Sequence, residues 1–217
     1  MATEEDELRA VDGRVPGRRG LATRQRLLDE TAAQLDKSSF RDLKVIDIAR
    51  DAGTSPATFY QYFADIESAV LALAEQMVEA SPLAQVIEST AWTDAAALAG
   101  SFATVDAFLG FFAEYQPVLR VVDLLMSEGD DRFGEVRARM LNPAARELSA
   151  IVERHQGEGR HADGVDPMAH AGVLVTMLAH IAGRQPAFEH WGIGPADLRN
   201  SLARQLCWGV TGLSPQE

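Results

Sequence analysis

Residues 44–63, KVIDIARDAGTSPATFYQYF, predict two short helices that are separated by a tight turn. Gly53 follows the first helix, at a position where glycine enters the left-handed conformation without a Cβ clash. Ser55 can cap the second helix with its hydroxyl, and Pro56 takes the first helical position, where a missing N–H is harmless. Two helices joined by a short glycine-containing turn are typical of the helix-turn-helix motif, whose second helix enters the DNA major groove.

The second helix of this motif combines a core face with a polar face. Phe59 and Phe63 are four residues apart and share one face, which we assign to the core. Thr58, Gln61 and Tyr62 lie on or near the opposite side. Glutamine can contact adenine bidentately, a threonine methyl can meet a thymine methyl, and tyrosine hydroxyls reach phosphates. An ordinary amphipathic surface helix would explain the aromatic residues alone, but the cap, proline, turn and polar face together favour a DNA-reading helix.

Residues 23–77 resemble the N-terminal domain of TetR-family transcriptional repressors, through the segments DIARDAG and SPATFYQYF. The resemblance implies helices at residues 23–36, 45–52 and 56–63, and a fourth helix at 65–80. Helix-forming residues dominate the whole chain and strand-like alternation is hard to find, so we predict an all-α protein. The DNA contacts that the resemblance implies are Arg24, Lys44, Thr54, Ser55, Pro56, Ala57, Thr58, Tyr60, Gln61 and Tyr62.

The chain departs from the family pattern at two positions. The family usually has a lysine at the start of the fourth helix, where it meets a DNA phosphate, but here that position is Ile66, between Asp65 and Glu67. We expect the free backbone N–H groups of this helix end still to face an anion. The usual basic residue early in the DNA-reading helix is also absent, because Pro56 takes its place. Weakened phosphate anchoring follows from both changes.

The distribution of charge decides whether this acidic chain can approach DNA. The formal net charge is −12, but residues 14–62 hold nine cations against six anions and sum to +3. Residues 1–13 sum to −4 and residues 63–217 sum to −11. A positive balance of charge is therefore confined to the segment with the motif. Distant acidic residues are screened over a Debye length of about 10 Å, so the local field governs contact with phosphates.

Three segments organise the chain. We expect residues 1–22 to form a flexible arginine-rich arm that orders into a minor groove on DNA, although a solvated tail explains the same composition. Residues 23–64 would form the helix-turn-helix domain, and residues 65–217 a ligand-binding and dimerisation domain. In the latter, apolar patterns and prolines predict helices at residues 82–88, 101–115, 117–126, 131–156, 166–183 and 195–208.

The last two predicted helices carry apolar residues on several sides, so they must bury several sides. The resemblance implies that they pair with a second copy in a four-helix interface, whereas core helices of a monomer are the alternative. A homodimer would place two reading helices on a palindromic double-stranded DNA operator.

The middle helices are expected to enclose a pocket for a small hydrophobic ligand. Aromatic and methionine residues at helical spacing also occur in ordinary cores, so each assignment has a structural alternative. The candidate lining residues are Phe108, Phe111, Phe112, Tyr115, Leu119, Val122, Met126 and Met140.

Other classes of function find no support in the sequence. The single cysteine, Cys207, cannot form an internal disulfide, which fits a reducing cytoplasm. No metal-binding histidine pair, phosphate-binding loop or nucleophile motif is present, so we expect no metal, no cofactor and no enzyme activity. Asp163 and Asp166 read as solvated loop charges. We also expect no apolar run that is long enough to span a membrane, and hence no membrane partner.

These features predict a TetR-like transcriptional regulator, functioning as a repressor that binds DNA as a dimer and responds to an apolar ligand. DNA and ligand would weaken each other's binding by the same factor. Ile66 and Pro56 keep an alternative open, namely a small-molecule-binding or interaction protein of the same fold with weak or lost operator binding.

Overall fold

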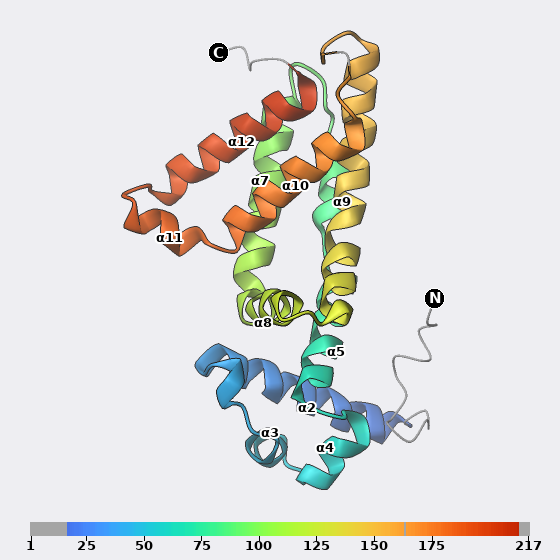
Figure 1. Cartoon of the computed structure of the whole chain (residues 1–217), viewed down its shortest axis with the longest axis vertical. Coiled ribbons are helices and arrows are strands. Elements are labelled where there is room, and N and C mark those ends of the chain that lie inside the picture. Colours follow the sequence, from blue (N-terminus) through green and yellow to red (C-terminus); the bar gives the residue numbers. More distant parts are fainter. Residues whose placement is uncertain (1–16, 163, 213–217) are drawn as a thin grey trace. The chain divides into compact units, whose positions relative to one another are not determined.

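The computed structural model describes residues 17–162 and 164–212, and within them every regular element is helical (Figure 1). The all-α prediction is therefore confirmed. The helices group into two compact units, one of residues up to 79 together with 117–136, and one of residues 80–116 together with those from 137 onward. The predicted arm falls mostly on residues 1–16, which lie outside the described residues.

The first unit contains the predicted helix-turn-helix. Its elements are α2 (Arg18–Lys37), η1 (Phe40–Asp42), α3 (Val45–Asp51), α4 (Pro56–Tyr62) and α5 (Ile66–Glu79), followed later in the chain by α8 (Gln116–Ser127). Helix α2 begins at Arg18, five residues before the predicted start, with Gly17 at its N-cap. The other boundaries lie within one residue of those predicted for this segment.

Helix α2 organises the core of this unit, because α3, α4 and α5 all pack against it. Leu27, Leu28 and Leu35 are buried along one face of α2. Ile48 of α3 and Phe59 of α4 are fully buried as well, on two of the helices that pack on α2. Full burial of a side chain such as phenylalanine contributes about 1.5–3 kcal/mol, so the burial of these side chains fixes the orientation of the short helices, which are too short to be stable alone.

Helix α8 joins the first unit through an amphipathic pattern, with Val118, Val121 and Val122 among its buried residues. The chain after α8 is tied to η1 by an ion pair between Arg41 and Glu128. Both side chains are largely exposed, so the pair orients the segment more than it stabilises it.

The second unit is built around α7 (Ala97–Glu114). The other helices are α6 (Leu83–Glu88), α9 (Asp131–Gly157, from residue 137 onward in this unit), α10 (Pro167–Ala182), α11 (Gln185–His190) and α12 (Pro195–Thr211). Helix α12 has the most extensive packing on α7, and α6 and α10 also pack on it. Figure 1 shows α11 at the turn between α10 and α12. The sequence analysis missed α11, which is only six residues long and contains no buried residue.

Two contacts set the packing of α12. The Arg199 guanidinium donates to both carboxylate oxygens of Asp106 on α7, each at 2.5 Å, and lies 4.5 Å from the ring centroid of Phe102. On the side of α10, a Cβ at Gly209 would meet Leu174 Cδ2 at 2.7 Å. Glycine at this position therefore permits the close approach of α10 and α12.

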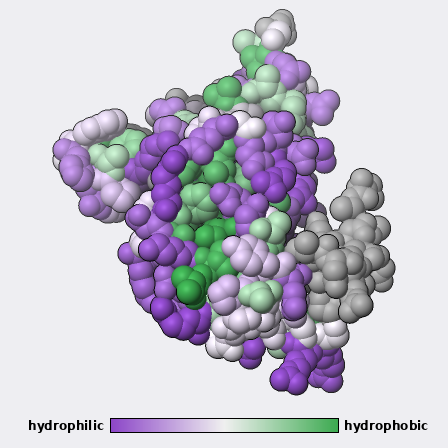
Figure 2. All heavy atoms as spheres, turned by 60° about the horizontal axis from the view of Figure 1, so that its bottom comes forward, coloured by the Kyte–Doolittle hydropathy of each residue, from purple (hydrophilic) through white to green (hydrophobic). Residues whose placement is uncertain are grey.

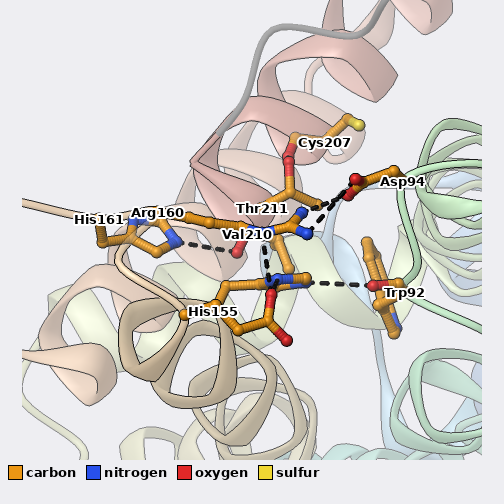
Figure 3. A network of polar contacts seen from close by, with 9 residues as sticks. Trp92, Asp94, His155, Arg160, His161, Cys207, Val210 and Thr211 are labelled. Carbon is orange, nitrogen blue, oxygen red and sulfur yellow. Dashed lines mark hydrogen bonds and ion pairs between the residues drawn. The ribbon is translucent and has the colours of Figure 1, made fainter.

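A polar network closes the end of the second unit (Figure 3). His155 Nε2 donates to the Trp92 carbonyl at 3.1 Å, and His161 Nε2 donates to the Val210 carbonyl at 3.0 Å. Arg160 pairs with Asp94 and with Glu158. The connector after α9 is thereby held to the segment before α7 and to the last turn of α12.

The connector ends at Asp166, whose carboxylate accepts from the Ala169 N–H at 2.6 Å and caps α10. Our interpretation of Asp166 as a solvated loop charge was therefore wrong. Asp163 lies outside the described residues.

Helix α7 is long and apolar enough, by length and composition, to cross a membrane. The expectation that no apolar run reaches this length was therefore wrong. Eight of its residues are buried, including Val105, Phe108 and Phe112, and three helices pack on it. This burial is the behaviour of the core helix of a globular domain.

Candidate nucleic-acid interface

The turn between α3 and α4 has the geometry that its residues predict. Gly53 has φ +68°, in the left-handed region, and the Thr54 N–H donates to the Ala49 carbonyl at 2.8 Å. The Ser55 hydroxyl oxygen accepts from the Thr58 N–H at 3.2 Å, which caps α4, and Pro56 is its first residue. The predicted helix-turn-helix geometry is confirmed.

Aromatic residues on its buried side anchor α4. Phe59 and Phe63 are both buried, with ring centroids 5.5 Å apart, as predicted. Tyr60 packs edge-on against Phe59, with centroids 5.7 Å apart, yet half of its surface remains exposed. The exposed face of α4 is therefore held rigidly by the buried one, which is what a DNA-reading surface requires.

The structure brings eight of the ten predicted DNA contacts together on α4 and the turn before it. Thr54, Thr58 and Tyr62 are half-buried, and the other five are exposed: Ser55, Pro56, Ala57, Tyr60 and Gln61. In Figure 2, hydrophilic residues occupy much of the visible face and border a hydrophobic region. The clustered exposed groups on α4 include hydroxyl and amide groups that can contact base edges and phosphates.

The remaining two predicted contacts, Lys44 and Arg24, lie on other elements. Lys44 is exposed at the N-cap of α3. The guanidinium carbon of Arg24 lies 5.3 Å from the Phe63 ring centroid, at the residue that ends α4. Ile46 on α3 is 60% exposed although it is apolar, and the sequence analysis did not single it out.

Arg50 contributes less positive charge to this surface than the sequence suggests. Its guanidinium pairs with Asp51 at 3.0 Å and with Asp47 at 2.8 Å. The hydrogen bond with Asp51 and the two nearby carboxylates raise the pKa of Arg50. The exposed cations of α2, Arg18, Arg19 and Arg26, together with Lys44, therefore provide more of the field that phosphates would meet.

The start of α5 differs from the expected arrangement. The Asp65 carboxylate accepts from the Ser68 N–H at 2.7 Å and from the Ser68 hydroxyl at 2.5 Å. One of the N–H groups that we expected to face an anion is thus already occupied, and a negative charge stands beside it. Asp65 thus acts as an intramolecular cap, and a phosphate contact at the remaining N–H groups of this helix end stays a prediction.

The predicted ligand residues have mixed exposure. Tyr115 is half-buried and Met126 is 41% exposed, whereas the other six are buried: Phe108, Phe111, Phe112, Leu119, Val122 and Met140. A cavity of about 440 Å³ in the first unit and one of about 380 Å³ in the second are lined by other residues. The ligand assignments stay predictions.

Comparison with protein families identifies the chain. Residues 83–217 match the family described as "Tetracyclin repressor-like, C-terminal domain", and residues 27–73 match "Bacterial regulatory proteins, tetR family". The chain belongs to the TetR family of bacterial regulatory proteins. Its N-terminal unit thus carries the DNA-binding domain of a transcriptional regulator, and TetR-family regulators are not enzymes.

Solved structures share the TetR fold at low sequence identity. A protein from Rhodococcus sp. RHA1 has a TM-score of 0.63 and 21% identity, with 87% of this chain and 95% of that chain covered. The regulator FadR from Bacillus subtilis, solved with stearoyl-CoA, has a TM-score of 0.60 and 15% identity, covering 87% and 98%. MbdR from Azoarcus sp. CIB has a TM-score of 0.58 and 16% identity, covering 88% and 98%. No curated protein matches the chain.

Proposed function

We propose that this TetR-family protein is a cytoplasmic repressor that binds a palindromic operator as a homodimer and releases it in response to an apolar small molecule. The observation that carries the proposal is the exposed polar face of α4, set on a capped helix over the buried Phe59 and Phe63. Gln61 and Tyr60 are the residues of that face best suited to base and phosphate contacts.

Exposed apolar side chains on the last helices support a dimer. Val173 and Met168 on α10 are 66% and 42% exposed, and Trp208 on α12 is 37% exposed. These two helices pack on each other, so their apolar residues lie on neighbouring elements. Pairing with the same helices of a second copy would bury this surface and relate the two α4 helices by a two-fold axis.

Apolar residues of the second unit support the ligand response. Phe108 stacks on Phe112, with centroids 6.3 Å apart, and Phe111 contacts Tyr115 at 4.9 Å. FadR of Bacillus subtilis, which shares the fold, was solved with stearoyl-CoA. If the ligand binds the dimer form with badly spaced α4 helices, DNA and ligand oppose each other by linkage, typically by about 5–150-fold.

The start of α5 favours a second candidate function. Asp65 occupies the helix end, and Ile66 replaces the family's lysine, so one phosphate contact is lost. A protein that kept the fold and the small-molecule response but lost operator binding would tolerate these residues.

Salt dependence of DNA binding separates the two candidates. We expect the full-length protein to bind the DNA upstream of its own gene, with an affinity that falls steeply with salt. Six to ten phosphate contacts would lower it by about 10³–10⁵-fold between 50 and 200 mM salt. Fluorescence anisotropy on labelled promoter DNA measures this slope. Absence of binding even at 50 mM salt would reject the repressor and support the second candidate.

A further inference from the structure

One buried hydroxyl, on α7 of the second unit, behaves differently from the other buried hydroxyls of the described residues. Thr31, Ser101 and Thr211 are buried, and each donates to the carbonyl four residues earlier in its helix, at 2.7, 2.8 and 2.8 Å respectively. Thr104 on α7 is fully buried, but its Oγ1 has no hydrogen-bond partner among the described residues. Thr104 therefore does not form the local bond that its counterparts form.

A buried hydroxyl without a hydrogen-bond partner lowers the stability of the fold. Buried polar groups in native proteins are nearly always hydrogen-bonded, and each exception calls for a physical reason. A buried water would need two to four polar neighbours. The residues that follow Thr104 on its face of α7, Phe108 and Phe111, offer ring carbons instead. A molecule from outside the chain can supply the missing partner.

The position of Thr104 places it beside residues that the sequence analysis predicted to contact ligand. Thr104, Phe108, Phe111 and Tyr115 follow the spacing i, i+4, i+7, i+11, which places them on one stripe of α7. A different face of α7 packs on α12, because Asp106 and Phe102 contact Arg199 there. The unpartnered hydroxyl thus lies on the same stripe as three of the residues predicted to contact ligand.

We propose that the ligand of this regulator is an apolar, ring-sized molecule with one carbonyl or hydroxyl oxygen, which accepts a hydrogen bond from Thr104 Oγ1. Its apolar part lies against Phe108 and Phe111. The inference rests on the proposed ligand response and adds to it a polar group of defined class and the residue that reads it. A ligand of this kind gains affinity because it satisfies a donor that is unsatisfied in the free protein.

The first test needs no ligand. Thr104→Val removes the hydroxyl at nearly constant shape, and we expect the midpoint of thermal unfolding to rise by roughly 2–4 °C because an unsatisfied buried group is lost. Thr31→Val is the matched control. It removes a hydroxyl that is hydrogen-bonded, so its midpoint should fall. A midpoint that falls in Thr104→Val as it does in Thr31→Val would show that the hydroxyl has a partner in the free protein, and would overturn the inference.

The second test uses three molecules of similar shape: acetophenone, 1-phenylethanol and ethylbenzene. Differential scanning fluorimetry of the full chain should show a larger upward shift with the two oxygen-containing molecules than with ethylbenzene. In Thr104→Val the three shifts should become equal. Equal shifts already in the unaltered protein would contradict the role of Thr104 but leave the ligand response intact. No shift with any of the three, at concentrations up to their solubility, would count against an apolar ring-sized ligand and thus against both proposals.

Discussion

At the scale of single residues, Asp65 combines an observed role in capping α5 with a predicted effect on DNA binding. Its carboxylate accepts a hydrogen bond from the Ser68 N–H and so caps α5, the helix that follows the helix-turn-helix. The same carboxylate places a negative charge at the helix end where the family resemblance implies a phosphate contact. Arg132 offsets part of this charge. The pKa of Arg132 is raised mainly by its hydrogen bond with Asp130, and also by the nearby charges of Asp65 and Glu67. Stability and DNA affinity therefore make opposite demands on Asp65.

Asp65→Asn should separate these two roles. Asparagine caps helices as well as aspartate does, so the unfolding midpoint should change little. DNA affinity should rise about threefold at low salt, the size expected for removing one charge about 7 Å from a phosphate in water. Anisotropy with promoter DNA measures the gain. Asp65→Ala is the control, because it loses both charge and cap and should bind DNA better but unfold about 1 kcal/mol more easily. Weaker binding by Asp65→Asn would contradict this account of the α5 end.

Single-residue roles were only partly predictable from sequence. Ser55 could be assigned as a cap because the following proline marks a helix start. Asp65 and Asp166 could not, since a carboxylate in a connector looks the same whether it is solvated or accepts from an N–H three residues later. The distance from the carboxylate to that N–H depends on the backbone conformation of the folded chain. The unsatisfied hydroxyl of Thr104 was invisible for the same reason.

At the scale of elements, the packing of α12 on α7 depends on a charged pair at its outer edge. Arg199 donates two hydrogen bonds to Asp106, which hold the pKa of that carboxyl below its usual value of 3.8. A lowered pKa in the folded state means that the pair stabilises the fold at pH values above the unfolded pKa. This stabilisation is lost as the pH falls through the lowered folded pKa.

In Asp106→Asn, the free energy of unfolding should therefore depend less on pH in the acid range. The variant should be less stable than the unaltered protein at pH 7, by no more than about 1 kcal/mol, because both side chains are partly exposed. Below about pH 4 the difference should begin to shrink, because aspartate of the unfolded chain protonates there and Asp106 of the folded protein protonates at a still lower pH. Urea unfolding at pH 7 and pH 3 measures both differences, with Glu189→Gln on the exposed surface of α11 as control. A difference that is the same at both pH values would rule out this role for the pair.

Elements were predictable where several local signals coincide. The boundaries of α3 and α4 follow from apolar spacing, a glycine in the left-handed region, a serine cap and a proline, all within twelve residues. Helix α11 has only Pro186 near its start and buries no residue, so no apolar periodicity predicts it. The early start of α2 was missed because arginines and glycine at 18–20 read as an arm, although Gly17 provides an N-cap. In α7, mostly apolar residues on all sides obscured which face binds α12.

At the scale of the whole molecule, local positive charge and two-fold symmetry together would allow an acidic chain to bind DNA. Residues 14–62 sum to +3 and the rest of the chain sums to −15, which gives the net charge of −12. A second copy would double the basic surface on one side of a palindromic site, so affinity would depend on the pair more than on one head. Fold and reading helix could be predicted because they depend on local patterns. The ligand site could not be fixed, because it depends on side chains from distant segments whose chemistry alone does not mark them as ligand contacts.

The central claim is that α4 reads base edges, once in each copy of a symmetric pair. Gel-shift titration of promoter DNA with Gln61→Ala tests it most directly, with the dimer checked by light scattering. Gln85→Ala, an exposed glutamine on α6, is the matched control. We predict a loss of about 5–150-fold in affinity for Gln61→Ala, the cost of one bidentate base contact, with the dimer intact and Gln85→Ala unaffected. Equal affinity of both variants and the unaltered protein would contradict the claim.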